Sequence, residues 1–397
     1  MKRKIISMVL ILSLAFNTVG QTAIAYNKTN SNTGLIKLDD KGIEKCVKDV
    51  ALEWAETVKP DVDFTLGEFK EINVVDSNEP EYTVSYFSNA LPYGYAVVVF
   101  QNNEAIVKEA NINPGQEGIY TDLVDTVIDV TDTSRKKLDI DKQIVELAPM
   151  QYGVVAKRKS DKAEKIYDNF GSEIRTDEIK YYTTEYNNNT SIMIRNWNKN
   201  SYKELSSVVL KKYKSRPKLL SEDYIELLTG KYCCVVQALL QIAYMEKLTT
   251  LQGTKIKSTF NTLWKYCDVE VDHVERGVQY GGAGIYDAKS AFVKFAKEKG
   301  YKKTSNHFLE WSPSVNWIKE RLKNNEPIAL FYKIRTKYGK EAHTISVLGL
   351  KRAKKKSSGN AWNYLMVYDG WHNTVSYINY STVDFADCKA AYFTVKK

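Results

Sequence analysis

Residues 233–244 read CCVVQALLQIAY, and this stretch decides most of what we expect of the fold and its chemistry. From Val235 to Met245, apolar side chains recur at i, i+3, i+4 and i+7, which is typical of a buried helix. Cys234 would lie in the first turn of that helix, where the partial positive charge of the N-terminus favours the thiolate. Cys234 is therefore a candidate nucleophile, although a buried and inert cysteine would fit the same pattern.

Two residues further along the chain supply the other groups that a thiol nucleophile needs. His343 begins a predicted strand over residues 343–348, and Asp369 follows a predicted strand over residues 364–368. A Lys-rich loop joins the strands, so we expect them to pair as antiparallel neighbours and to bring Asp369 close to His343. The imidazole would take the thiol proton, and the carboxylate would orient the imidazole. Taken singly, His343 also fits an ordinary half-buried position, and Asp369 fits a common turn.

The remaining segments predict an α+β protein in two parts. The first part, over residues 26–155, has a helical pattern followed by a meander of short strands. A polar linker is predicted over residues 156–190, and residues 191–397 then have helices before strands, the order of a two-lobed domain with a helical lobe and an antiparallel sheet lobe. The individual predictions are helices over 41–58, 234–245, 287–299 and 315–324, and strands over 82–87, 95–100, 105–110, 328–333, 375–378 and 391–395.

The first 25 residues have the pattern of a secretory signal. A positively charged start, residues 2–4, precedes an apolar run over 5–16 and the small-residue sequence Ala23-Ile24-Ala25. The apolar run is too short to span a bilayer comfortably. We therefore expect a mature protein outside the cell, either free or associated with the cell wall. Removal of the signal would reduce the net charge from +9 to about +6, a weak bias that predicts no nucleic-acid partner.

The cysteine content argues against a disulfide framework and against a metal centre. The chain has five cysteines, an odd number that is small for its length, so at least one thiol is unpaired unless it bridges two molecules. No C-x-x-C pair occurs, and His273 is the one histidine near Cys267. We predict neither a metal nor a cofactor. The basic run over residues 351–356 is interpreted as a solvated loop.

Several segments of the C-terminal part follow one another in a recognisable order. Gln241-Ile242 lies seven positions after Cys234, and the sequence YGGAG over 280–284 precedes a helix that ends at Gly300-Tyr301. The segment 317–328 fits a helix, a turn and a strand, and Ala342-His343 begins a hydrophobic strand. In this order the segments resemble streptopain-type secreted cysteine proteases of the papain-like superfamily and, more distantly, staphopain. The likeness covers most of residues 191–397.

This resemblance implies a papain-like fold and a role for each residue of the site. Cys234, rather than Cys233, would be the nucleophile, His343 the base and Asp369 the orienting group. The Cys234 backbone N–H, with Asn196 or Gln237, would stabilise the oxyanion. The substrate cleft would be lined by Tyr280, Gly281, Gly282, Gly284 and Trp371.

The resemblance extends upstream of the predicted linker. Residues 81–84 and 94–99 are similar to strands of the family's inhibitory prodomain. Residues 26 to about 190 would therefore cover the active site until they are cleaved. The partners implied are a protein or peptide substrate and the chain's own prodomain, in a protein expected to be a monomer.

Three positions depart from the family pattern. Leu228 stands where papain-like enzymes carry the glutamine that donates to the oxyanion, so either the other groups named above supply the donors or the activity is weak. The family's Asn-Trp-Gly-Trp motif appears as residues 368–371, YDGW, and a strict alignment would give the orienting position to Tyr368 instead of Asp369. Cys233 adjoins the nucleophile, where it would either form a regulatory disulfide or be a bystander.

The leading hypothesis is a secreted cysteine endopeptidase that is made as a prodomain-inhibited zymogen. A cell-wall amidase or endopeptidase of the cysteine-histidine kind would also be exported and would also place its thiol at a helix N-terminus. A non-catalytic relative that binds a host or wall ligand is the third hypothesis. Leu228 and the 27 tyrosines of the chain favour that third interpretation, because tyrosine suits binding surfaces.

Overall fold

The computed structural model of the chain describes most residues between Leu35 and Lys396. The predicted signal over 1–25 lies outside the described residues, as does most of the segment 175–233. The residues within 35–396 that are not described are 75–76, 78, 131–137, 159–163, 170, 172, 175–191, 196–201, 214–233, 251–253, 276–277, 302, 306–308, 337–338, 357, 371, 373, 384 and 386.

The chain is an α+β protein, which confirms the predicted class. In the N-terminal part, the predicted helix and the three predicted strands, β3 to β5, are confirmed, whereas β1, β2, α2 and the strands after α2 were not predicted. The elements are β1 (Leu35–Lys37), α1 (Asp40–Val58), β2 (Thr65–Val74), β3 (Glu81–Ser88), β4 (Leu91–Gln101), β5 (Glu104–Ile112), α2 (Ile119–Val130), β6 (Leu138–Ala148), β7 (Gln151–Arg158), β8 (Glu164–Asp168) and β9 (Glu173–Ile174).

The C-terminal part contains the predicted helices followed by the predicted strands, together with helix α5 and strands β10 to β15, which were not predicted. Its elements are β10 (Met193–Arg195), β11 (Tyr202–Val209), α4 (Cys234–Met245), α5 (Thr254–Tyr266), β12 (Glu270–Glu275), β13 (Val278–Gly282), α6 (Ile285–Glu298), β14 (Lys303–Ser305), β15 (Leu309–Trp311), α7 (Val315–Lys323), β16 (Ile328–Thr336), β17 (Gly339–Lys355), β18 (Ala361–Tyr368), β19 (Ser376–Asn379), β20 (Lys389–Tyr392) and β21 (Thr394–Lys396).

Two local predictions differ from the structure. Of the predicted linker, residues 156–158 end β7 and residues 164–168 form β8, which pairs with β7 in an antiparallel ladder and buries Ile166 and Tyr167. The basic run over 351–356 is not a solvated loop, since β17 continues to Lys355. Lys355 is 2% exposed, and its ammonium group donates to the backbone carbonyl of Ala105. The lysine stem is thus packed in the core while its head is satisfied by backbone.

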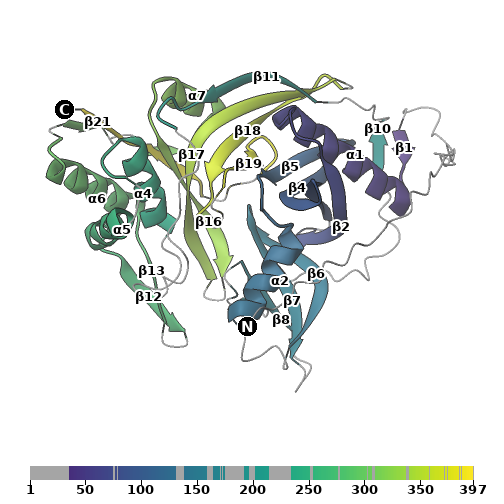
Figure 1. Cartoon of the computed structure of the whole chain (residues 1–397), viewed down its shortest axis with the longest axis horizontal. Coiled ribbons are helices and arrows are strands. Elements are labelled where there is room, and N and C mark those ends of the chain that lie inside the picture. The colour runs from purple at the N-terminus through teal and green to yellow at the C-terminus, as the bar shows by residue number, and fades with distance from the viewer. Residues whose placement is uncertain are drawn as a thin grey trace, which may run out of the picture.

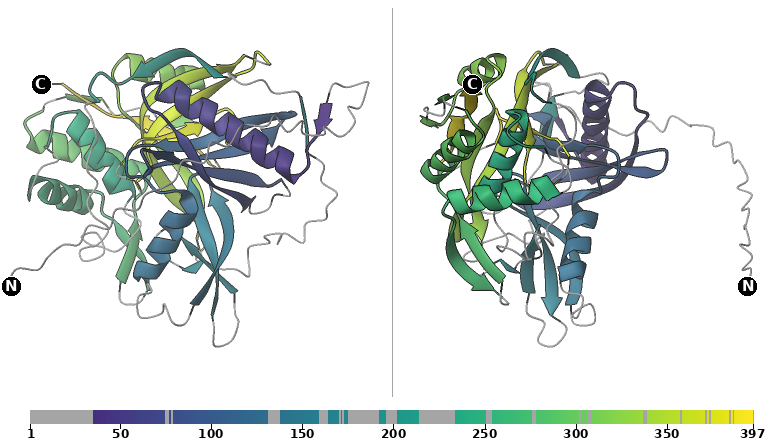
Figure 2. Two further views of the ribbon diagram at one scale, coloured as in Figure 1. Left: turned by 45° about the vertical axis from the view of Figure 1, so that its right-hand side comes forward. Right: turned by 60° about the vertical axis from the view of Figure 1, so that its left-hand side comes forward.

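A single large sheet crosses from the N-terminal to the C-terminal part of the chain. Its strand order is β15-β20-β16-β17-β18-β19-β5-β4-β3-β2-β6-β7-β8-β9, and β11 pairs with β17. The junction is the antiparallel pair β19 and β5, in which Ser376 lies opposite Asn111 and Ile378 lies opposite Glu109. Figures 1 and 2 show that α4, α5 and α6 lie at one side of the molecule and that α1 lies at the other.

Gly94 is required where β4 approaches β5. Its φ is +113°, a conformation that residues with a side chain rarely adopt. A Cβ at this position would lie 1.8 Å from the backbone oxygen of Asn111. The close approach holds the end of β5, and with it Asn111, against the neighbouring strand, next to the β19 junction.

The two parts share one hydrophobic core. Trp54, on α1, is fully buried, and its ring lies 4.0 Å from that of Tyr364 on β18, measured between centroids. Tyr202 and Tyr377 contact the same indole edge-on, at 5.4 and 6.2 Å. The Tyr364 hydroxyl donates to the backbone carbonyl of Val107 on β5, at 3.0 Å. Side chains from both parts thus enclose the same tryptophan.

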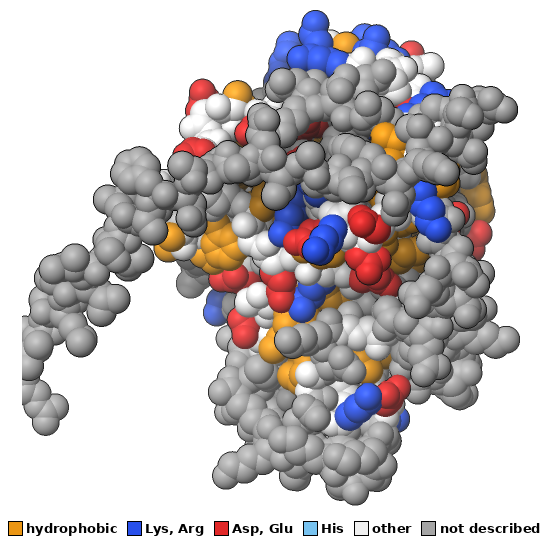
Figure 3. Space-filling view, turned by 90° about the vertical axis from the view of Figure 1, so that its right-hand side faces the viewer, with side chains coloured by type: hydrophobic (Ala, Val, Ile, Leu, Met, Phe, Trp, Pro, Cys, Tyr) orange, Lys and Arg blue, Asp and Glu red, His pale blue; other side chains and the backbone are white. Residues whose placement is uncertain are grey.

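The described surface beside α1 is polar and mixed in charge. Lysine and arginine side chains gather at the top of the face in Figure 3, and acidic and basic side chains are interspersed over the rest of it. On α1, the pairs Lys45–Asp49 and Lys48–Glu44 each join residues one turn apart. Among the described residues, no helix is long and apolar enough to cross a membrane.

We predict that Trp54→Ala destabilises the whole chain in one step. Removing a fully buried tryptophan leaves a cavity and typically lowers the free energy of unfolding by about 3–5 kcal/mol. Urea unfolding should therefore show one transition with a lower midpoint for both parts. Trp311→Ala is the control, since Trp311 is 63% exposed and its loss should change the free energy by less than about 1 kcal/mol. Two separate transitions, with the C-terminal one unchanged, would contradict the shared core.

Candidate active site

Cys234 is the first residue of α4, and its thiol lies beside the strand that carries His343. The sulfur is partly exposed and lies 3.8 Å from the backbone oxygen of Ala342, the residue before His343. Helix α4 is fixed on β17 by the Ser346 hydroxyl, which donates to the Ala238 carbonyl at 3.2 Å. The thiol of Cys234 thus lies beside the main chain that leads into His343.

A backbone carbonyl determines which ring nitrogen of His343 carries the proton. Nε2 of His343 lies 2.7 Å from the backbone oxygen of Asp369. Since a carbonyl oxygen only accepts hydrogen bonds, Nε2 is the donor, and the neutral ring has an unprotonated Nδ1. Gly370 makes this turn possible with a φ of +89°, and a Cβ there would lie 3.8 Å from Cε1 of His343. The ring is thus a proton acceptor at Nδ1.

The structure places Asp369 beside His343, as predicted, but the contacting atom differs from the one expected. The Asp369 carboxylate is fully buried and accepts three hydrogen bonds. The donors are the backbone N–H of His372 at 2.8 Å, Nδ1 of His372 at 2.7 Å and the Ser376 hydroxyl at 2.9 Å. The prediction that the carboxylate orients His343 is therefore wrong in its atom. Because three nearby donors hold the carboxylate within its own turn, the backbone carbonyl faces His343 instead.

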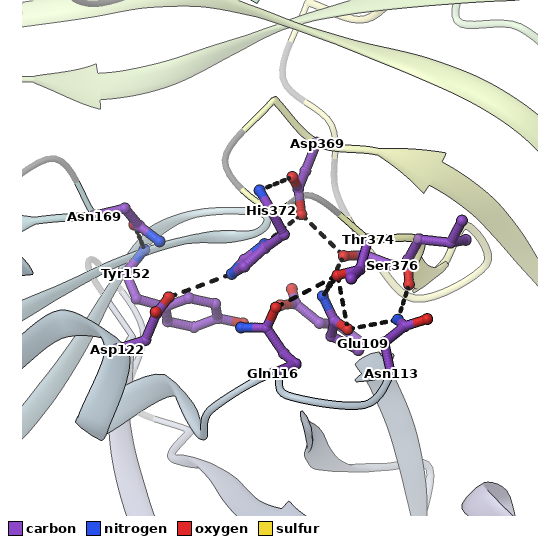
Figure 4. A network of polar contacts seen from close by, with 12 residues as sticks. Glu109, Asn113, Gln116, Asp122, Tyr152, Asn169, Asp369, His372, Thr374 and Ser376 are labelled. Atoms are coloured by element: carbon purple, nitrogen blue, oxygen red, sulfur yellow. Dashed lines mark hydrogen bonds and ion pairs between the residues drawn. The ribbon is translucent and has the colours of Figure 1, made fainter. Parts of the chain in front are cut away.

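His372 is held between two carboxylates (Figure 4). Its Nδ1 contacts Asp369, and its Nε2 lies 3.4 Å from Oδ2 of Asp122 on α2. Burial opposes a charge on the ring, but the negative charges of Asp369 and Asp122 outweigh it and raise the pKa of His372 well above its ordinary value. His372 is therefore charged at neutral pH and links the two parts of the chain.

His343 has the opposite electrostatic environment. The ring is 3% exposed, and burial lowers its pKa from 6.5 to about 4, although the bond to the Asp369 carbonyl favours the charged form. His343 is consequently neutral at pH 7. The neutral ring is a proton acceptor, but a stable pair of thiolate and imidazolium is disfavoured while the site stays this deeply buried.

Tyr332 connects the base to the N-terminal part. Its ring lies edge-on to His343, with 5.4 Å between the ring centroids. Its hydroxyl donates to the backbone oxygen of Pro149, in the turn between β6 and β7, at 3.3 Å. Met150, in the same turn, is buried in the common core. A segment from the N-terminal part therefore lies over the tyrosine that packs against the imidazole.

The predicted cleft residues are only partly placed. Residues 280–282 belong to β13 and pair with β12, so the predicted glycine loop begins as a strand. Gly282 faces open space, and Gly284 is the N-cap of α6, where its N–H donates to Asp287 at 2.9 Å. Gln237 is buried within α4, and its side-chain oxygen has no partner. The other predictions, on Asn196, Leu228, Cys233 and Trp371, lie outside the described residues.

The sequence interpretation missed His372, Ser376, Asp122 and Tyr332. A signal for the first was available, because the chain has four histidines and one of them lies three residues after Asp369. That spacing allows the aspartate to bond the backbone and ring of the histidine in one turn. Asp122 and Tyr332 had no such signal, since their contacts join distant segments.

The other described thiols differ from Cys234. Burial raises the pKa of Cys46, Cys267 and Cys388 to about 12 in each case, and all three are enclosed in the core. They are therefore inert thiols. Within the described part of the chain, no group of three or more histidine, cysteine, aspartate or glutamate residues is arranged to hold a metal ion.

No family model matches the sequence, and no curated protein matches it at a significant level.

We predict that an alkylating reagent modifies Cys234 in the native protein while the three buried cysteines stay protected. Iodoacetamide treatment followed by peptide mass spectrometry measures this directly. Fragmentation of the peptide that holds both Cys233 and Cys234 assigns the modified sulfur, modification at position 234 should be lost in Cys234→Ala and kept in Cys233→Ala, and denaturation should expose Cys46, Cys267 and Cys388 in the same sample. Native labelling of the buried three at a rate equal to that of Cys234 would contradict the arrangement.

The lowered pKa of His343 also predicts an acid-sensitive stability. The unfolded chain binds a proton at His343 below about pH 6.5, but the folded chain does so only near pH 4, so stability falls as pH drops through that window. In His343→Gln this contribution is absent, and urea midpoints should decline less between pH 6.5 and 4 than in the wild type. Equal declines would show that His343 is not buried in its neutral form.

Proposed function

We propose that the chain is a cysteine peptidase in a latent form, with Cys234 as nucleophile and His343 as general base. One observation carries the proposal. A partly exposed cysteine at a helix N-terminus lies beside the strand that carries a histidine, and that histidine has its Nε2 proton engaged by a backbone carbonyl. Nδ1 of His343 is then the nitrogen that would accept the proton of the Cys234 thiol, which is the role that a thiol nucleophile requires of its base.

Peptide hydrolysis would use the imidazole ring of His343 and the N-terminus of α4. Nδ1 of His343 takes the thiol proton as the Cys234 sulfur attacks the scissile carbonyl carbon, and a tetrahedral oxyanion forms. Backbone N–H groups at the start of α4 would stabilise that charge, because these groups have no partner within the helix. His343 then returns the proton to the leaving amine, the carbon–nitrogen bond breaks, and water hydrolyses the acyl-enzyme by the same route.

The latent form is supported by the burial of the base. Tyr332 lies against His343 and bonds to Pro149 of the N-terminal part, and the imidazole is neutral in this setting. Residues 26 to about 190 would be the inhibitory prodomain of a papain-like, two-lobed enzyme secreted as a zymogen. Its separation would expose the site to peptide substrates and raise the pKa of His343.

A time course of maturation tests the proposal. The chain is expressed without residues 1–25, and the full-length band is followed for wild type, Cys234→Ala, His343→Ala and Cys233→Ala. Conversion is expected in the wild type and in Cys233→Ala, which is the matched control because it removes the adjacent thiol. Cys234→Ala and His343→Ala should stay intact. Equal conversion of all four, or a loss caused by Cys233→Ala alone, would contradict the assignment.

A non-catalytic binding role is the second candidate, and the shared core favours it. Release of the N-terminal part would expose Trp54, Tyr364 and the edge of β19, which is a large penalty for activation. If an external protease removes the N-terminal part and the remaining chain neither cleaves casein nor reacts with a thiol-protease inhibitor, binding is the preferred function.

A further inference from the structure

Residues 369–376, here called the His372 loop, carry the carbonyl that orients His343. The loop joins β18 to β19, and its first residue supplies that carbonyl. Figure 4 shows His372 reaching Asp122 and Thr374 reaching Gln116, both in the N-terminal part of the chain. The position of the carbonyl therefore depends on contacts made by segments far away in the sequence.

The far end of the His372 loop is held by the end of β5 and the residues after it. The side-chain amide of Asn111 donates to the Thr374 hydroxyl at 3.0 Å and to the Ser376 hydroxyl at 3.3 Å. The amide of Asn113 donates to the Val375 backbone oxygen at 2.9 Å. Asn111 is fully buried, and its hydrogen bond to Ser376 is shielded from water and strengthened by the low local polarity.

The near end of the loop is held through charge. His372 is 8% exposed and bonds the Asp369 carboxylate through both its ring and its backbone. The opposite ring nitrogen faces Asp122 on α2. A continuous path thus leads from Asp122, through His372 and Asp369, to Nε2 of His343.

We infer that His372 is a positioning residue, through which the N-terminal part of the chain sets the place of the carbonyl that orients His343. The inference rests on the proposed function and concerns the regulation of the same site. His372 touches neither the thiol nor the imidazole, and it acts by holding Asp369. If the ring of His372 lost its charge, its attraction to the carboxylates of Asp369 and Asp122 would weaken. Asp369 would then be held less firmly.

The groups around His372 determine when that charge is lost. Asp369 lies on its own loop and Asp122 on α2, while the ring of Tyr95, on β4, lies 6.3 Å away between centroids. The Tyr95 hydroxyl donates to Glu109 on β5, at 2.9 Å, and burial raises the pKa of Glu109 to about 7. Every charged neighbour is acidic, so the environment favours the protonated ring.

The sign of the pH dependence follows from these neighbours. Because the folded-state pKa of His372 is raised, the stabilisation by its charge is fully present below about pH 6.5 and is lost as pH rises through the folded value. The coupling between the two parts of the chain should therefore loosen at alkaline pH. The ionisation of Glu109, whose pKa is about 7, is expected as a separate event at lower pH.

Histidine NMR of the full chain without residues 1–25 tests the inference. The chain has four histidines, so single His→Gln variants assign the signals. We expect an alkaline midpoint for His372, and a change in the His343 signals at the same midpoint. Asp122→Asn removes one of the two charges and should lower both midpoints together by about one pH unit or more.

Asp125→Asn is the matched control, because Asp125 lies on the same helix and is exposed. It should move both midpoints by only a few tenths of a pH unit. His372→Gln should remove the alkaline step from the His343 signals, while its unfolding midpoint reports whether the fold is kept. A simple structural role for His372 would not produce a midpoint shared by two histidines.

Two results separate this inference from the proposed function. If the His343 signals ignore the ionisation of His372, or keep their alkaline step in His372→Gln, the positioning role is wrong. If iodoacetamide fails to modify Cys234 in every variant, the peptidase proposal is wrong, but a shared midpoint would still establish the coupling.

Discussion

The hydrogen bond from Nε2 of His343 to the backbone carbonyl of Asp369 is the interaction on which the site depends. It gives the imidazole one tautomer and one orientation, and it uses main chain where a side chain was expected. The carboxylate of Asp369 is then available to bind His372 and Ser376, so the backbone and the side chain of one residue together serve three neighbours. Helix α4 is anchored to β17 at Ser346, and the thiol of Cys234 at its first residue lies beside the carbonyl of Ala342, the residue before His343.

The continuous sheet explains how distant segments come to control that bond. Pairing of β5 with β19 places Asn111 next to the His372 loop, and the turn between β6 and β7 brings Pro149 to Tyr332. The N-terminal part is therefore built into the core and does not merely cover the site. This has two opposing consequences: it buries the base in its neutral form, and it holds the orienting carbonyl in position. If the proposed peptidase is activated, His343 would have to be uncovered while the carbonyl of Asp369 stays in position.

Local patterns predicted the elements that carry the chemistry, and tertiary contacts decided the rest. The apolar period after Cys234 and the alternation after His343 are strong local signals, and the pairing of β17 with β18 followed from a hairpin between consecutive strands. The contact between Asn111 and Ser376 joins residues 265 positions apart, and no local pattern encodes it. The atom that Asp369 presents to His343 depends on the positive φ of Gly370. The strand at Tyr280 was hidden because glycine-rich sequence usually indicates a turn.

The tautomer of His343 tests the central claim most directly. Nitrogen-15 chemical shifts of the His343 ring, measured in the full chain at pH 7, distinguish a protonated Nε2 from a protonated Nδ1. We expect a protonated Nε2 and a lone pair on Nδ1. A protonated Nδ1, or a ring that is charged at pH 7, would contradict it.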